Sequence, residues 1–575
     1  MTKPFTVQGL LEDYRAGRLR PSDVARDVIA RADAIDAPVW ISRVCDEELL
    51  AVAARLDEMN PELPLYGIPF AVKDNMDVAG IPTTAGCPGF AYEPSETATV
   101  VQLLQDAGAM LIGKTNMDQF ATGLVGTRSP YGVDGSVFDA DRVSGGSSSG
   151  SALAVALGLV AFSLGTDTAG SGRVPAGFNG LVGLKPTRGL ISTRGVVPAC
   201  ASLDCVSVFA QSAVDASLVL GVAAAFDAED PWSRKAEVPM SPRGGRLGVP
   251  LTGQLEFTEH EAEAAWRATL AKAAEQWTLV PVDISPMLDA APLLYASWVA
   301  ERTADLLEII EGEPEGLDPT VARIVRSGRD LSAVDVFAAA HKLASLRRAA
   351  EPVWDEIDAL LLPTTPGHPT HEQVAADPVG VNESLGQFTN FVNLMDLSAV
   401  AVPGEARSDG LPFGVSLLAP AFHDWRLLNA SASWGGEDSG VSEPGLVPLA
   451  VVGAHLSGMP LNRQLTDRGG RFVRATTTAP DYRFFALPDG KRPALSRATD
   501  GDGAAIECEV WDMPAAALGE LLGLIGAPLG LGRVTLADET EITSFICESG
   551  ALAGATDITD HGGWRPYFSA QVTAV

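Results

Sequence analysis

The sequence predicts an α/β domain with a largely interior sheet, followed by a small α+β or β-barrel domain. Two observations lead to this prediction. Short apolar segments alternate with helix-like segments over residues 1–430. Residues 431–446 are then rich in Ser, Gly and acidic residues, and short β-like runs dominate residues 447–575. We therefore expect a first domain over 1–430, a linker over 431–446 and a C-terminal domain over 447–575.

Hydrophobic periodicity places the elements of each domain. The first domain should hold helices at 5–35 (with Ser22 as N-cap), 97–107, 261–277 and 334–357, and strands at 65–72, 110–113, 359–363 and 411–418. The C-terminal domain should hold strands at 449–452, 471–475, 482–487 and 505–511, and a helix at 513–525.

Length and charge limit the function classes. A chain of 575 residues is too long for one hydrophobic core. Its net charge of −32 argues against nucleic acid or an anionic membrane surface as a partner. An anionic small molecule would need a local cation to overcome this field.

Cysteine usage and the N-terminus predict a cytoplasmic protein. The six cysteines are scattered and form no CxxC pair, which fits a reducing compartment. The first residues lack the apolar region of a signal peptide. The longest apolar run, residues 152–164, has the length of a buried helix and is too short to cross a bilayer.

Two Gly/Ser clusters stand out at residues 145–150 and 168–172, on either side of that apolar run. Such clusters are usually linkers, but these lie in Ala-, Leu- and Val-rich sequence, which predicts backbone packed inside a core. Small residues there let the backbone approach a ligand and direct N–H groups at it. A serine among free amides is what acyl transfer requires.

Lys73 ends the apolar segment that precedes these clusters. Burial disfavours the ammonium form, so such a lysine can serve as a neutral base near pH 7. No histidine is near Ser147 or Ser171 in the sequence, which favours a Ser-Lys arrangement over Ser-His-Asp. Taken singly, a Gly/Ser loop is more often a packing site and a buried lysine more often an ion pair.

Residues 60–425 resemble the amidase signature family. The resemblance rests on GIPFAVKDN (67–75), GGSSSGSA (145–152) and GTDTAGSGRVPAGFNGLVGLKPT (165–187). It implies an α/β fold with a mixed central sheet surrounded by helices. It also implies a nucleophile at Ser171, a proton relay at Ser147 after a cis peptide bond, and a base at Lys73. The same resemblance implies an oxyanion hole formed by the backbone N–H groups of Thr168, Ala169, Gly170 and Ser171. It assigns supporting roles to Ser148, Asp167 and Arg173.

A later segment, LYASWVAER (294–302), resembles a segment of the allophanate hydrolases. In that family a tyrosine and an arginine hold the small substrate, which implies substrate-binding roles for Tyr295 and Arg302. A guanidinium can hold a carboxylate through two parallel hydrogen bonds. The competing interpretation is an amphipathic helix with a surface arginine.

The tail resembles the C-terminal domain of the same family, which is similar in fold to the γ-glutamyl cyclotransferases. Four motifs carry this resemblance: VVGAHLSGMPLNRQL (451–465), TAPDYRFFALPDG (478–490), EVWDMP (509–514) and APLGLGRVTLADE (527–539). The glutamyl-tRNA amidotransferase subunit shares the first domain but normally lacks such a tail.

The resemblance implies hydrolysis of allophanate (urea-1-carboxylate) to ammonia and carbon dioxide. The first domain would release ammonia and leave N-carboxycarbamate, and the C-terminal domain would assist its decarboxylation. His455 would act in that second step, with Asn462 and Glu509 as companions. The competing interpretation of His455 is a side chain that satisfies a loop backbone.

We expect no cofactor and no metal. The sequence shows no phosphate-binding or dinucleotide fingerprint, and His368 and His371 have no third ligand nearby. The resemblance implies a homodimer. Because no biotin carboxylase segment is present, allophanate should come from a separate urea carboxylase or an upstream amidohydrolase.

Three alternatives remain open. The first domain could be a general amidase for another small amide. The C-terminal domain could be a binding or assembly module without chemistry. A catalytically inactive scaffold is disfavoured because Lys73, Ser147 and Ser171 are all present.

Overall fold

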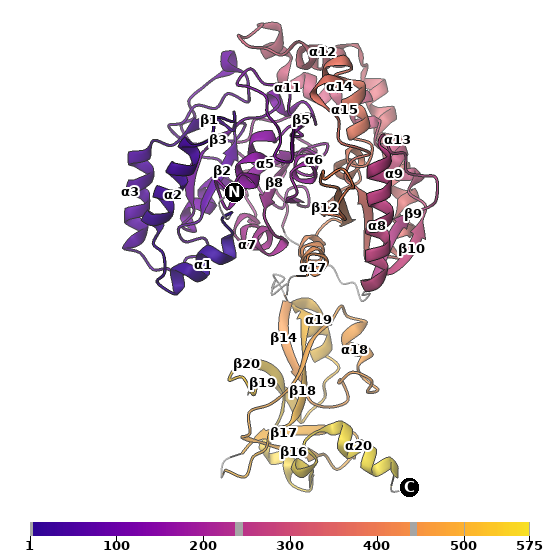
Figure 1. Cartoon of the computed structure of the whole chain (residues 1–575). Coiled ribbons are helices and arrows are strands. Elements are labelled where there is room, and N and C mark those ends of the chain that lie inside the picture. The colour runs from indigo at the N-terminus through magenta and orange to yellow at the C-terminus, as the bar shows by residue number, and fades with distance from the viewer. Residues whose placement is uncertain (1–3, 236–244, 437–445, 499–500, 574–575) are drawn as a thin grey trace. The chain divides into compact units, whose positions relative to one another are not determined.

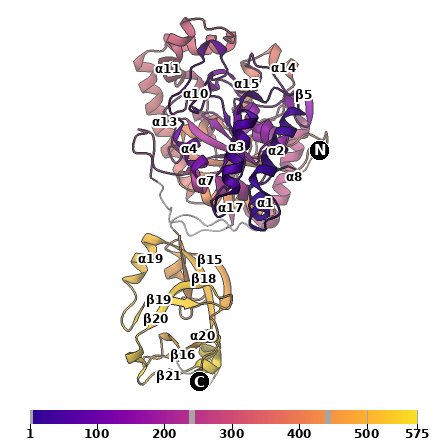
Figure 2. The same ribbon diagram turned by 90° about the vertical axis from the view of Figure 1, so that its left-hand side faces the viewer.

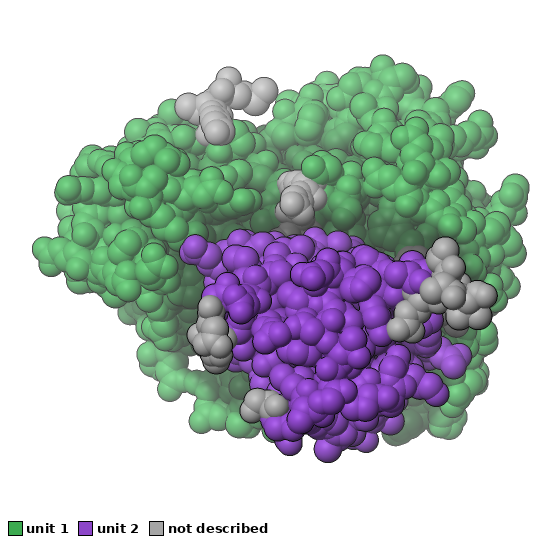
Figure 3. Space-filling model, turned by 90° about the horizontal axis from the view of Figure 1, so that it is seen from below, with its two compact units in different colours: residues 1–237, 245–441 green, residues 238–244, 442–575 purple. Residues whose placement is uncertain are grey.

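A mixed sheet of 11 strands forms the centre of the larger of two compact units in the computed structural model (Figure 1). The structure describes residues 4–235, 245–436, 446–498 and 501–573. The larger unit comprises the described residues up to 436 and the smaller unit those from 446 onward, and Figure 3 colours them separately. Across the large sheet the strands run in the order β1 (Trp40–Arg43), β3 (Met110–Thr115), β2 (Pro69–Lys73), β6 (Phe162–Asp167), β8 (Cys205–Ala210), β7 (Val182–Lys185), β12 (Leu397–Pro403), β13 (Gly414–Pro420), β11 (Ala359–Pro363), β9 (Arg246–Pro250) and β10 (Thr278–Val282).

This sheet contains two groups of parallel strands with a series of antiparallel pairs between them. Strand β2 pairs in parallel with β3 and β6, and β9 pairs in parallel with β10 and β11. The pairs between these two blocks, from β6–β8 to β13–β11, are antiparallel. Every residue of β2, β3, β6 and β8 is buried, as expected for strands covered on both faces. The predicted α/β class with a mixed sheet is confirmed.

Helices surround the sheet (Figures 1 and 2). In the larger unit they are α1 (Val7–Arg15), α2 (Pro21–Asp33), α3 (Asp46–Asp57), α4 (Thr99–Asp106), α5 (Ser149–Ala156), α6 (Val174–Phe178), α7 (Ala213–Ala223), α8 (His260–Gln276), α9 (Ser285–Ala290), α10 (Leu293–Ala296), α11 (Val299–Glu311), α12 (Pro319–Ser327), α13 (Ala333–Trp354), α14 (His371–Ala376), α15 (Gly380–Leu385), α16 (Asn390–Leu394) and α17 (Asp424–Trp434). A small hairpin joins β4 (Gly135–Ser136) to β5 (Asp139–Val143).

Helices α5 and α6 fix the place of the site. The two helices contact each other, and α5 lies against β2, β3, β6 and β8. The first Gly/Ser cluster leads into α5, and the second lies between β6 and α6. Both clusters therefore lie beside β6, close to the end of β2.

Three sequence expectations for this unit need correction. The apolar run 152–164 is not one helix, because α5 ends at Ala156 and the left-handed Gly158 (φ 70°) turns the chain into β6. Residues 5–35 form two helices. Ser22 is not an N-cap, because Pro21 takes the first helical position of α2 and Arg20 precedes it as the N-cap.

The expected linker over 431–446 also differs in part. Residues 431–434 form the last turn of α17, and Leu446 begins the first strand of the smaller unit. Residues 437–445 lie outside the described residues.

The smaller unit contains two sheets and three helices among its described residues. A five-stranded sheet runs in the order β15 (Arg471–Thr477), β18 (Glu507–Pro514), β14 (Leu446–Val451), β20 (Glu541–Cys547) and β19 (Leu529–Thr535). A three-stranded sheet consists of β17 (Pro493–Arg497), β16 (Tyr482–Ala486) and β21 (Thr556–Asp557). The helices are α18 (Arg463–Thr466), α19 (Ala515–Leu522) and α20 (Trp564–Thr573). This mixture confirms the predicted α+β class.

No helix in the described ranges combines the length and the apolar character that crossing a bilayer requires.

Candidate active site

Lys73 is the last residue of β2 and is completely buried between β3 and β6. Its Nζ donates hydrogen bonds to Ser147 Oγ and Thr166 Oγ1, both at 2.7 Å. Burial disfavours the ammonium form and lowers the pKa of Lys73 to about 7, against the opposing field of nearby carboxylates. That change corresponds to about 5 kcal/mol between the two protonation states. The amine can therefore change its protonation state near neutral pH.

The loop that carries Ser147 is anchored through its backbone. The Gly146–Ser147 peptide bond is cis. The carbonyl of Ser147 accepts from Asp118 N at 3.0 Å, and Gly146 N donates to Leu124 O at 2.9 Å. Ser148 Oγ donates to Thr166 O at 3.2 Å, which ties this loop to β6. The Ser147 hydroxyl is thereby held against Lys73.

The second cluster forms a tight turn between β6 and α6. Gly170 has a φ of 138°, and a Cβ at this position would overlap the Thr389 side chain. Within the described residues, the backbone N–H groups of residues 168–171 meet no hydrogen-bond acceptor. Ser171 Oγ donates to Gly123 O at 3.4 Å, and no hydrogen bond joins it to Ser147 Oγ in this part of the chain. The turn thus offers a buried hydroxyl beside unpaired amide donors.

A buried ion pair braces this turn. Arg173 donates to both carboxylate oxygens of Asp167 at 2.9 Å, and neither side chain is exposed. Burial alone would raise the pKa of Asp167, but the Arg173 guanidinium holds it below its usual value. The Asp167 carboxylate also accepts from Gly172 N at 3.0 Å. The pair therefore fixes the chain on both sides of Ser171.

Arg302 and Tyr295 reach the same region from α11 and α10. Arg302 is only 6% exposed, so it is not a surface arginine of an amphipathic helix. Its NH1 group donates to Thr122 Oγ1, and Thr122 precedes the glycine whose carbonyl Ser171 contacts. Tyr295 lies beside Asn382, which donates to its hydroxyl oxygen at 3.3 Å. The structure therefore brings Arg302, Ser171 and Tyr295 around one short segment, residues 122–124.

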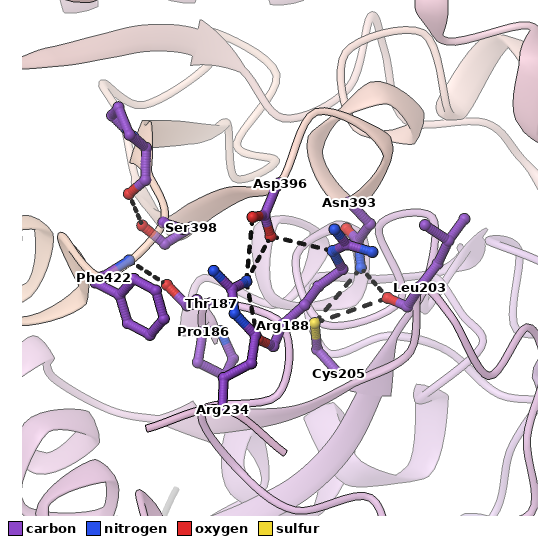
Figure 4. Close-up of polar contacts among 12 residues, drawn as sticks. Pro186, Thr187, Arg188, Leu203, Cys205, Arg234, Asn393, Asp396, Ser398 and Phe422 are labelled. Atoms are coloured by element: carbon purple, nitrogen blue, oxygen red, sulfur yellow. Dashed lines mark hydrogen bonds and ion pairs between the residues drawn. The ribbon is translucent and has the colours of Figure 1, made fainter. Parts of the chain in front are cut away.

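The loop of residues 199–205 connects α11 to the turn that carries Ser171. Glu301, next to Arg302, accepts from Ser202 N at 2.7 Å and from Ser202 Oγ at 2.6 Å. In the same loop, Asp204 accepts from Thr168 Oγ1. Arg188 donates to the Ser202 carbonyl at 2.6 Å. Figure 4 shows two further contacts at this loop: Arg188 pairs with Asp396, and Asn393 donates to the Leu203 carbonyl at 2.8 Å. The position of Arg302 is thus coupled to that of the turn.

His455 belongs to the smaller unit. It is 8% exposed, its Nε2 lies 3.0 Å from Gln464 Oε1, and its ring stacks on Phe545. Burial lowers the pKa of His455.

The expected companions of His455 surround its loop. Asn462 donates to the His455 carbonyl at 2.8 Å. Glu509 accepts from Ser457 N at 2.8 Å and pairs with Arg565. Burial alone would raise the pKa of Glu509, but Arg565 lowers it. The loop of residues 455–457 therefore carries a neutral imidazole at His455 and binds the charged carboxylate of Glu509 at Ser457.

The two closely spaced histidines do not form a ligand pair. His368 is buried, stacks on Phe178 and binds Val143 O through Nε2 at 2.8 Å, whereas His371 begins α14. Across the described ranges, no group of three or more His, Cys, Asp or Glu side chains is placed to hold a metal ion.

Sequence reasoning missed three side chains of this region: Thr166 beside Lys73, Thr122 beside Arg302 and Asn382 beside Tyr295. Thr166 could have been found only from the parallel pairing of β2 with β6. Thr122 and Asn382 carry no motif of their own, and each lies far in sequence from its partner.

Comparison with known proteins identifies two family matches. The model of the family described as Amidase matches residues 23–428, and that of the allophanate hydrolase C-terminal domain matches residues 447–569. The chain is similar to a urea amidolyase of Saccharomyces cerevisiae, at 43% identity over 92% of this chain and 31% of that protein. It therefore spans about a third of this curated relative.

Two further relatives are matched by this chain over most of their own length. The solved structure of selenomethionine-substituted Kluyveromyces lactis allophanate hydrolase is 40% identical, with a TM-score of 0.83 over 98% of this chain and 99% of that one. A glutamyl-tRNA(Gln) amidotransferase subunit of Chloroflexus aggregans is 33% identical over 75% of this chain and 96% of its own length.

The buried Asp167–Arg173 pair predicts a large loss of stability when one partner is removed. Arg173→Met should lower the free energy of unfolding by about 3–5 kcal/mol, because it leaves a buried carboxylate without its counter-ion. Urea denaturation measures this change. As a matched control, Arg267→Met removes an exposed arginine paired with Glu263 and should change stability by less than about 1 kcal/mol. Equal losses in the two variants would contradict the prediction.

Proposed function

The chain belongs to the amidase family, and from that membership we propose that it hydrolyses allophanate, releasing ammonia through an acyl-enzyme on Ser171. One observation carries the choice of substrate. The buried Arg302 guanidinium contacts Thr122, beside the glycine whose carbonyl Ser171 contacts. A cation at this place suits a small amide that bears a carboxylate a few bonds from its reacting carbonyl.

The proposed reaction begins with Ser171. Its Oγ turns from the Gly123 carbonyl and attacks the terminal amide carbon of allophanate. The Ser171 proton passes to Ser147 Oγ while the Ser147 proton passes to neutral Lys73, whose Nζ already lies within hydrogen-bond distance. The negative oxygen of the tetrahedral intermediate accepts from the backbone N–H groups of residues 168–171. Each such donor is typically worth about 3–4 kcal/mol of barrier.

Lys73 then acts as an acid. Its proton returns through Ser147 to the leaving nitrogen, the C–N bond breaks, and ammonia departs. Water attacks the remaining acyl-enzyme and gives a proton to Lys73. The bond between the acyl carbon and Ser171 Oγ then breaks, and the proton returns through Ser147 to Ser171 Oγ. The product is N-carboxycarbamate. A pKa near 7 suits both steps, because the amine must accept and donate a proton in each cycle.

Arg302 supplies a local cation in an acidic chain. A net charge of −32 opposes the approach of an anion at long range. Within the buried site, a guanidinium can bind the allophanate carboxylate through two hydrogen bonds, and Tyr295 can donate a third. These contacts hold the amide carbon beside Ser171.

For the second step, we propose that the C-terminal domain assists the decarboxylation of N-carboxycarbamate through His455. The family match over residues 447–569 and the neutral imidazole of His455 support this role. The alternative is a small-amide hydrolase whose C-terminal domain binds or assembles without chemistry.

The proposal extends to the setting of the enzyme. We place it in the cytoplasm because all six cysteines are free thiols. The resemblance to the allophanate hydrolases implies a homodimer. Its substrate would come from a separate urea carboxylase or from an upstream amidohydrolase. Both reactions produce a urea derivative that carries a carboxylate.

A comparison of two substrates tests the proposed specificity. Biuret replaces the carboxylate of allophanate with a neutral amide of similar shape. Arg302→Met should raise KM for allophanate by about tenfold or more, because it removes a charge-assisted hydrogen bond, and should change KM for biuret much less. Ammonia release measures both reactions, and Ser171→Ala, which lacks the nucleophile, gives the background.

The same assay can overturn the proposal. If wild-type enzyme hydrolyses neutral amides far faster than allophanate, the chain is a general amidase. If Ser171→Ala retains turnover, the acyl-enzyme mechanism is wrong.

The low pKa of Lys73 predicts the pH dependence of the first step. The free enzyme should lose kcat/KM for allophanate as pH falls through about 7, because protonation of the amine removes the base. A pH–rate profile for ammonia release measures this limb. Lys73→Arg stays protonated and should be inactive at every pH. A wild-type profile that stays flat through neutral pH would contradict the assignment.

Substitution of His455 tests the second step. His455→Asn should leave ammonia release from the first step unchanged and delay carbon dioxide by about tenfold, with unaided decarboxylation as the floor. Stopped-flow detection of both products measures the lag, and His561→Asn in the same unit is the control. If carbon dioxide appears at the wild-type rate, the C-terminal domain is a non-catalytic module.

A further inference from the structure

Asn382 lies in α15 between Tyr295 and the segment of residues 122–124. It is 3% exposed and uses both ends of its amide group. Its Oδ1 accepts from Leu124 N at 2.7 Å, and its Nδ2 donates to the Tyr295 hydroxyl oxygen at 3.3 Å. Because a backbone N–H can only donate, Leu124 fixes which end of the amide is oxygen. The nitrogen must therefore face Tyr295.

This orientation determines what the Tyr295 hydroxyl can do. A phenol carries one proton and accepts through its oxygen. The oxygen already accepts from Asn382, so the proton is directed away from Asn382. Within the described residues, no acceptor meets that proton. The Tyr295 hydroxyl proton is therefore available for donation to a ligand.

We propose that Asn382 is a positioning residue that keeps the Tyr295 hydroxyl as a hydrogen-bond donor to the substrate carboxylate. This inference rests on the proposed function, because it takes Tyr295 and a carboxylate-bearing amide as partners. It adds a second determinant of specificity that acts through Tyr295 and does not touch the substrate.

The surroundings of Asn382 hold it in this position. Arg128 donates to the Thr122 carbonyl at 2.9 Å and to the Pro378 carbonyl at 2.5 Å, which ties the segment of residues 122–124 to the start of α15. The Leu124 carbonyl accepts from Gly146 N, next to Ser147. A shift of Asn382 would therefore move both Tyr295 and the loop that carries Ser147, so the test must separate these two effects.

A double-mutant cycle with Tyr295→Phe separates them. Asn382→Leu keeps the approximate size of the side chain and removes both hydrogen bonds without adding charge. It should raise KM for allophanate by about tenfold when Tyr295 is present. In the Tyr295→Phe background the same substitution should change KM by less than about twofold, since the hydroxyl it orients is gone. In both backgrounds kcat should change little.

Asn382→Asp provides a variant that keeps the Leu124 hydrogen bond and so preserves the fold. A carboxylate at this position accepts the Tyr295 proton and withdraws it from the substrate. It should therefore raise KM for allophanate although the link to Leu124 is intact. Ser384→Asp adds the same charge two residues away in α15 and should leave KM near the wild-type value.

The outcomes distinguish this inference from the proposed function. If Tyr295→Phe raises KM but the effect of Asn382→Leu is equally large in both backgrounds, Asn382 acts only through the backbone and the inference is wrong. If Asn382→Asp binds allophanate as wild type does, the inference also fails. If wild-type enzyme does not hydrolyse allophanate, or Tyr295→Phe has no effect, the proposed function or the role of Tyr295 fails first.

Discussion

The burial of the Lys73 amine at the end of β2 is the constraint on which the rest of the site depends. Taking an ammonium out of water costs several kcal/mol, so the group is held near its neutral form. A neutral amine at this place needs hydrogen-bonding partners, and Ser147 and Thr166 provide them. Those partners require the loop that carries Ser147 and the end of β6 to meet beside Lys73, so the pairing of β2 with β6 and the anchoring of both Gly/Ser clusters follow from that requirement.

The glycines of the clusters serve close approach and not flexibility. Gly170 adopts a backbone conformation that other residues rarely take, and a side chain there would overlap Thr389. The turn is instead made rigid by the buried pair of Asp167 and Arg173. Free amide donors can then point into the site at no cost of reorganisation during the reaction, which is the condition for stabilising a developing oxyanion.

The sequence predicts the residues of the candidate site better than their supporting contacts. Lys73, Ser147 and Ser171 lie in local motifs, and the α/β class follows from periodicity. Asn382 meets Tyr295 across 87 residues, and Arg302 meets Thr122 across 180, so only the folded chain joins them. The apolar run 152–164 misleads for a related reason. Periodicity cannot separate a buried helix from a buried strand, and the division depends on the turn at Gly158.

The coupling between Arg302 and the Ser171 turn explains how binding can control the reaction. Glu301 of α11 binds Ser202 in the loop of residues 199–205, and Asp204 of the same loop binds Thr168. The positions of α11 and of the turn that carries Thr168 are therefore coupled. A substrate that engages Arg302 therefore acts on a framework that also positions the amide donors. A neutral amide of the same shape would lack that contact. In the proposed reaction, the buried Arg302 guanidinium thus selects the substrate by charge and places its carbonyl beside Ser171 through the same contact.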